Sequence, residues 1–158
     1  MAKILKIITE PNPDLRRKSA EIDLDMVGKD EFKKFYIDMA HTMKMKDGVG
    51  LAAPQVGKNI RMVVINTKNG EIVMINPEIT KFSWTKEWMD EGCLSVPTIF
   101  GKVQRHKKIQ CLYTNTDGKR INLEASGLMA RVIQHELDHL DGILFIDKAK
   151  NIHVQKID

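Results

Sequence analysis

The chain has 158 residues, a length that suits one domain with a hydrophobic core and is too short for two. Its composition is that of an ordinary globular protein, with 42% apolar and 29% charged residues, and its net charge of +4 is only mildly basic. Two cysteines are too few for a disulfide framework, and no apolar run is long enough to span a membrane. The sequence also lacks a block of basic residues with interleaved aromatics, which would indicate a specific nucleic-acid partner. We therefore expect residues 1–158 to form a single cytoplasmic domain that acts as a monomer away from membranes.

The first third of the chain combines a loop, a helix and a glycine-rich segment. Residues 9–25 carry two prolines and are expected to form an ordered loop. Residues 30–46 place apolar side chains at the helical period and lysines on the other face, which predicts an amphipathic helix. Residues 48–55 contain Gly48 and Gly50, which either form a turn or let a ligand approach the main chain closely.

Two pairs of apolar runs, each joined by a tight-turn dipeptide, predict β-hairpins. The dipeptides are Asn69-Gly70 and Asp117-Gly118. Pro77 is expected to end its strand or to place it at a sheet edge. The flanking strands are expected at residues 61–66, 71–76, 107–113 and 119–123, and a half-exposed strand at residues 82–88.

The end of the chain carries little pattern. Residues 143–146 are a short apolar run that fits either a strand or a tail. Residues 148–158 are polar, and we expect them to form a loose tail.

The strongest indication of chemistry is a helix that precedes this tail. Ser126 can cap its N-terminus, and Gly142 is placed for a left-handed cap at its C-terminus. His135 and His139 are four residues apart, so their rings can reach one metal ion from one side of the helix, while Glu136 can touch a bound water. This arrangement is typical of metal hydrolases in which the glutamate is the general base. The alternative is a buried core helix whose histidines are hydrogen-bonded and inert.

A third ligand is needed to support the metal site, and Cys93 is the candidate. Free cysteines are usually small buried apolar residues, and Cys111, inside an apolar run, is expected to be one of these. Cys93 lies among polar and small residues, and two histidines in need of a third partner favour a thiolate ligand there.

Two other functions fit the same helix. A zinc endopeptidase uses the same pair of histidines, but it takes its third ligand from a histidine or glutamate further along the chain. After His139 the sequence has one more histidine, His153, and no glutamate, which argues against this function. A binding module could retain the metal for structural reasons, but a structural zinc site normally has four protein ligands, and only three good ones are present.

Three stretches together resemble the peptide deformylase family. Its Gly-x-Gly-Leu-Ala-Ala-x-Gln, Glu-Gly-Cys-Leu-Ser and Gln-His-Glu-x-Asp-His motifs match residues 48–55, 91–95 and 134–139, in the same order. The resemblance implies an α+β fold with antiparallel sheets packed around a central metal-binding helix. It also implies removal of the formyl group from the N-terminal formyl-methionine of nascent chains, with transient proximity to the ribosome. The ion would be Fe(II) in the cell, with Zn, Ni or Co as substitutes in purified protein.

The motifs carry over residue roles as well. Cys93, His135 and His139 would be the metal ligands, and Glu136 the catalytic acid and base. The Gln55 side chain and the Leu94 backbone N–H would donate to the substrate carbonyl oxygen. Gly50 would offer its backbone to the peptide, and Val49, Met89, Leu128 and Val132 would line the methionine pocket.

The chain departs from its relatives at two places. Thr98 follows Pro97 where many relatives have glycine or an acidic residue, so contacts to the second and third substrate residues are not carried over. Several bacterial relatives also continue into a longer C-terminal helix, so a docking role for that helix is not carried over either.

Overall fold

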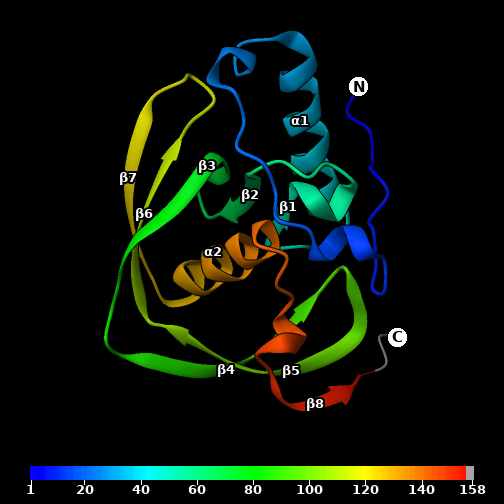
Figure 1. Ribbon diagram of the computed structural model, residues 1–158, viewed down its shortest axis with the longest axis vertical. Coiled ribbons are helices and arrows are strands. Elements are labelled where there is room, and N and C mark those ends of the chain that lie inside the picture. The colour runs from blue at the N-terminus through cyan, green and yellow to red at the C-terminus, as the bar shows by residue number, and fades with distance from the viewer. Residues whose placement is uncertain (156–158) are drawn as a thin grey trace.

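Two antiparallel sheets and two α-helices dominate the computed structural model, which describes residues 1–155 (Figure 1). The helices are α1 (Asp30–Met45) and α2 (Gly127–Leu140). The larger sheet has the order β1-β2-β3-β6-β7, formed by Gly50–Ala52, Met62–Thr67, Gly70–Phe82, Lys108–Thr114 and Arg120–Ser126. The smaller sheet has the order β4-β5-β8, formed by Lys86–Cys93, Val96–His106 and Lys150–Val154. Short 3₁₀ helices lie at Pro13–Arg16, Leu24–Met26, Ala53–Val56 and Phe145–Asp147.

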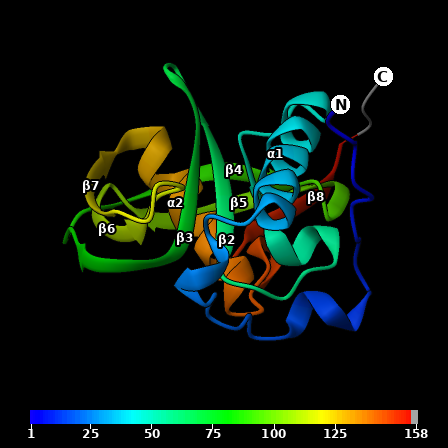
Figure 2. The ribbon, with the colours of Figure 1, turned by 90° about the horizontal axis from the view of Figure 1, so that it is seen from above.

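Strand β2 separates two hydrophobic clusters. Its run of four apolar residues is buried on both faces, as in a strand that is covered from both sides. Val63 and Ile65 belong to the cluster around α2, whereas Met62 and Val64 belong to the cluster around α1. The larger sheet therefore lies between the two helices, and Figure 2 shows α1 and the β6–β7 hairpin on opposite sides of the molecule.

Helix α2 is the centre of the fold. It packs on β1, β2 and β7 of the larger sheet and on β5 of the smaller one. Its apolar side chains Ala130, Ile133 and Leu140 have no exposed surface. The predicted fold class, antiparallel sheets around a central helix, is confirmed.

Two local expectations were wrong, and one of the two alternatives for Pro77 fits. Strand β3 does not stop at Pro77 but continues to Phe82; its pairing with β2 ends at Ile75, so from Pro77 on it pairs with β6 alone among the described strands and is an edge there. The expected strand at residues 82–88 is instead a junction where β3 ends and β4 begins. The polar tail is not loose, because residues 150–154 form β8, which pairs with β5; residues 156–158 lie outside the described part.

Within the described residues, neither helix is long and apolar enough to cross a lipid bilayer.

Candidate metal centre

Glycines determine where the ends of α2 lie. Gly127 (φ +59°) follows the extended Ser126 at the N-terminus, and Gly142 (φ +75°) lies just past the C-terminus. The Gly142 N–H donates to the carbonyl of His139, and the Ile143 N–H to that of Asp138, which closes the helix as a left-handed cap does. A side chain at Gly142 would also collide with the backbone of Arg16. The expected C-terminal cap is therefore present and is closely packed.

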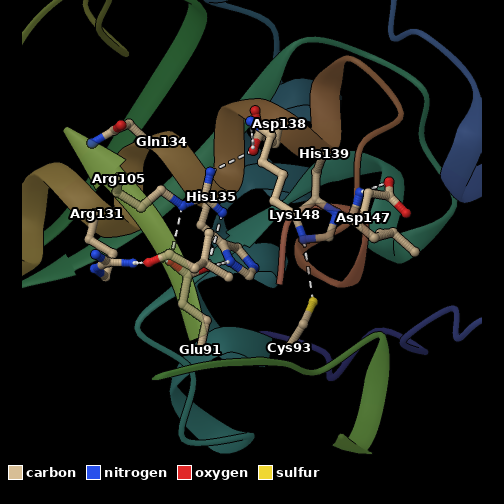
Figure 3. Close-up of polar contacts among 12 residues, drawn as sticks. Glu91, Cys93, Arg105, Arg131, Gln134, His135, Asp138, His139, Asp147 and Lys148 are labelled. Atoms are coloured by element: carbon tan, nitrogen blue, oxygen red, sulfur yellow. Dashed lines mark hydrogen bonds and ion pairs between the residues drawn. The ribbon is translucent and has the colours of Figure 1, made fainter. Parts of the chain in front are cut away.

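The three predicted ligands meet at one point. Cys93, at the end of β4, lies beside His135 and His139 of α2, and their donor atoms all lie within 4.8 Å of one another. Cys93 Sγ is 3.3 Å from His139 Nε2 (Figure 3). One thiolate and two imidazoles are a donor set that suits zinc, iron or cobalt, so the residues fit a divalent metal ion.

Glu91 orients the first histidine of this cluster. Its Oε1 lies 2.8 Å from His135 Nδ1, which leaves Nε2 of that ring free to face Cys93 (Figure 3). Burial raises the pKa of Glu91, but hydrogen bonds from His135 and Arg105 outweigh burial and hold the pKa well below its usual range. Burial lowers the pKa of His135, yet contacts with Cys93 and Glu91 raise it to about 10.

Two buried arginines hold Glu91 in place. Arg105 donates to both carboxylate oxygens of Glu91 at 2.9 Å and to Asp138 at 2.6 Å. Arg131 donates to Glu91 at 2.6 Å and to the Val103 carbonyl at 2.9 Å. The sequence analysis missed this network, although an arginine in the middle of an apolar helix signals a buried ion pair. Asp138 is a structural acceptor in the same network, because it pairs with Arg105.

Replacing Arg105 with leucine is expected to lower the free energy of unfolding by about 3–5 kcal/mol, because the buried Glu91 and the half-buried Asp138 lose their shared cation. Urea unfolding followed by circular dichroism measures the change. Arg17→Leu, which removes an exposed pair with Asp14, should cost less than about 1 kcal/mol. Equal losses in the two variants would contradict a structural role for the network.

Glu136 is buried directly beneath the strand that carries Gly50. A Cβ atom added at Gly50 would lie 2.8 Å from both Cγ and Oε1 of Glu136, so only glycine fits there. The other carboxylate oxygen, Oε2, is buried and has no partner among the described residues. Burial raises the pKa of Glu136 to about 7. The same burial lowers the pKa of His139 well below its usual value.

Gln55 reaches the ligand cluster from the 3₁₀ helix that follows β1. Its Oε1 accepts the Ala52 N–H at 2.9 Å, which fixes the orientation of the amide. Its Nε2 lies 3.4 Å from Cys93 Sγ and 3.1 Å from Ser95 Oγ. The glycine-rich segment therefore forms a short strand and a helical turn that bring a buried amide N–H to the sulfur.

A pocket of about 560 Å³ opens onto the cluster. Val49 and Leu128 are more than half exposed at its walls, and the buried Val132 lies deeper. Met89 is not among the residues that line this pocket; it pairs with Val103 in the middle of β4 and is 40% exposed. The lining also includes Gly50, Gln55, Cys93, Leu94, His135 and Glu136.

Thr98 lies at the rim of this pocket in an uncommon backbone conformation. Its φ of +66° is strained for a β-branched residue, and its carbonyl accepts the Gln155 N–H at 2.8 Å next to β8. We expect Thr98→Gly to raise the free energy of unfolding by about 1 kcal/mol, because glycine adopts this conformation without strain. Urea unfolding measures the change, with Thr85→Gly as a control that should gain nothing. A loss of stability in Thr98→Gly would contradict the strain.

Comparisons with known proteins agree with this geometry. The family model of polypeptide deformylase matches residues 4–155. A peptide deformylase from Syntrophomonas wolfei is 42% identical and covers 98% of this chain and 99% of its own length. The crystal structure of the Thermotoga maritima enzyme has a TM-score of 0.88 and 40% identity, covering 93% of this chain and 98% of its own. A peptide deformylase from Acinetobacter baumannii, solved with Met-Ala-Ser bound, has a TM-score of 0.89 and 31% identity, covering 94% of this chain and 99% of its own. The chain belongs to the polypeptide deformylase family.

Proposed function

We propose that this chain is a metal-dependent peptide deformylase that hydrolyses the formyl group from the N-terminal formyl-methionine of newly made polypeptides. One observation carries the proposal: a cysteine sulfur, two imidazoles and a buried glutamate converge at one pocket of about 560 Å³. Family membership supports the same activity and does not favour an endopeptidase or a purely structural metal site.

Cys93, His135 and His139 would hold one divalent ion. When bound, such an ion supplies the positive charge that makes water a nucleophile near neutral pH. The soft donor set supports iron, zinc, cobalt or nickel, and among these we propose Fe(II) for the cell. Glu91 would keep His135 in the tautomer that presents Nε2.

Glu136 would carry the proton through the reaction. Its unpartnered Oε2 lies in a buried site beside the pocket, where it can accept a proton from the attacking water. The same carboxyl group would then give that proton to the departing amine, so that formate and a free N-terminus result. The close contact with Gly50 restricts how far this carboxylate can turn.

The developing charge on the formyl oxygen needs hydrogen-bond donors. The Gln55 amide, held by the Ala52 N–H, is one, and the Leu94 backbone N–H is the second. Donors of this kind each contribute roughly 3 kcal/mol to stabilising such an oxyanion.

Val49, Leu128 and Val132 would surround the methionine side chain, and the Gly50 backbone would pair with the peptide. Exposed apolar side chains at the mouth of a pocket are typical of a site that buries an apolar ligand. The relative from Acinetobacter baumannii was solved with Met-Ala-Ser bound, which supports a peptide ligand for this chain. Met89 stays a proposed neighbour of this lining, because it lies on the same face of β4 as Glu91, which lines the pocket.

The proposal is tested by measuring formate release from formyl-Met-Ala-Ser, with metal analysis of the same sample. Formate release that follows the iron content supports the proposal. Cleavage of internal bonds in an unformylated peptide would favour the endopeptidase, and a folded, metal-loaded protein without either activity would favour the binding module.

We further propose that the protein works as a cytoplasmic monomer near the ribosome. Two free thiols fit a reducing compartment, and nascent chains are the source of formylated peptides.

A further inference from the structure

One face of the small sheet gathers lysines around a tryptophan. Direct partners in antiparallel strands share a face, and residues two apart along a strand do so too. Trp88 of β4 is opposite Gln104 of β5, and the next row joins Asp90, Lys102 and Lys150 across all three strands. Lys86 lies two residues before Trp88. We call this set, Lys86, Trp88, Lys102, Gln104 and Lys150, the lysine–tryptophan face.

The residues that alternate with this face are buried on the other side of the sheet. Glu91 and Arg105 bond to side chains of α2, and Val103 packs in the cluster with Leu15 and Phe145. One end of the face, formed by Lys86, Trp88 and Gln104, borders a hollow that residues of α2 also line. All five members of the lysine–tryptophan face are exposed. In Figure 1 the small sheet forms the lower margin of the molecule, with α2 above it.

The three lysines of this face have no ion pair among the described residues, and Asp90 is the one carboxylate in these cross-strand rows. Lys150 Nζ lies 5.0 Å from the centre of the Trp88 ring, so one cation already rests on the aromatic surface. With three lysines and one aspartate in these rows, the face has a net positive charge, which attracts a polyanion.

The turn beside this face adds two aromatic rings. Trp84 is fully exposed, and Phe82, which is about half exposed, packs against His106 with ring centres 4.6 Å apart. The Ser83 N–H donates to the Lys108 carbonyl, and the Lys107 N–H to the Thr85 carbonyl, so the turn also lies next to two more exposed lysines. Both tryptophans of the chain are therefore found at one basic corner.

We infer that the lysine–tryptophan face and the Trp84 turn bind single-stranded RNA without sequence specificity. Exposed aromatic rings let unpaired bases stack, and lysines beside them neutralise the phosphates. A duplex hides the faces of its bases, and an anionic membrane calls for a broader apolar surface, so the combination favours a single strand. The sequence did not reveal this surface, because buried residues alternate with its members along β4 and β5, and Lys150 comes from the distant strand β8.

This surface is separate from the proposed catalytic site. None of Trp84, Lys86, Trp88, Lys102 or Lys150 lines the pocket above the metal ligands. RNA binding and formate release can therefore fail independently in an experiment.

The inference is tested with a short fluorescein-labelled RNA of mixed sequence and the metal-loaded protein. Fluorescence anisotropy should show binding that weakens steeply with KCl concentration. Trp84→Ala, at a fully exposed position, should weaken binding about tenfold with an unchanged melting temperature. The triple variant Lys86→Gln, Lys102→Gln, Lys150→Gln should weaken binding and flatten the salt dependence.

The matched control replaces Lys29 and Lys33 at the start of α1 and Lys68 in the turn between β2 and β3 with glutamine, which removes the same charge at exposed positions elsewhere. This variant should bind RNA nearly as well as the unaltered protein, and both triple variants should release formate at the original rate. The inference is overturned if the protein does not bind RNA, if both triple variants weaken equally, or if duplex RNA, polyglutamate or phosphatidylserine vesicles bind at least as tightly.

Discussion

Glu136→Gln is expected to lower kcat for formate release by roughly 10²–10⁴-fold, because the amide cannot accept the proton of the attacking water. The side chains are nearly the same size, and the buried site already contains a carboxylate oxygen without a protein partner. We therefore expect metal content and melting temperature to stay close to those of the unaltered protein. Stopped assays with formyl-Met-Ala-Ser, together with metal analysis, measure both.

The control for this variant is Glu124→Gln, which changes a carboxylate on β7 that contacts only the Gln110 amide. It should leave kcat unchanged. If Glu136→Gln keeps full turnover while it carries its metal, the glutamate has no part in proton transfer and another base must be sought.

Cys93→Ser is expected to lose its metal during dialysis, whereas the unaltered protein keeps one ion per chain. A hydroxyl is a far poorer metal ligand than a thiolate. The affinity for the metal should therefore fall by more than the roughly 10–100-fold that is lost when a residue that hydrogen-bonds to a ligand is removed. Formate release should fall in parallel with metal content. Atomic emission analysis of dialysed samples measures the metal directly.

The second cysteine provides the matched control. Cys111 is fully buried in the core around α2, and burial raises the pKa of its thiol to about 11. Cys111→Ala should lower stability slightly and keep the metal. A Cys93→Ser protein that retains a full equivalent of metal would show that another residue is the third ligand.

Much of the metal centre was predictable because its key residues are close together along the chain. His135, Glu136 and His139 lie within about one helical turn, so their geometry follows from the helix alone. Cys93 has no such local signal, and it was identified only together with the histidines and the family motifs. The two hairpins were predicted from their turn residues, and both are present.

Features that depend on distant residues could not be predicted. The two arginines around Glu91 come from β5 and α2, and neither shows its partner in the sequence. Strand β8 consists of exposed residues without strong alternation, and it exists because β5 offers an edge to pair with. Met89 was assigned to the methionine pocket only by analogy, and alternation along β4 puts it on the same face as Glu91, two residues further on.

Strands β5, β6 and β7 stand between Cys93 and His135 along the chain. The donor atoms therefore meet only after these strands have been synthesised and paired, and a chain cut before Gly127 retains one of the three ligands. Uptake of the ion must follow folding rather than guide its first steps. A chain whose synthesis has not yet passed α2 therefore cannot assemble the cluster.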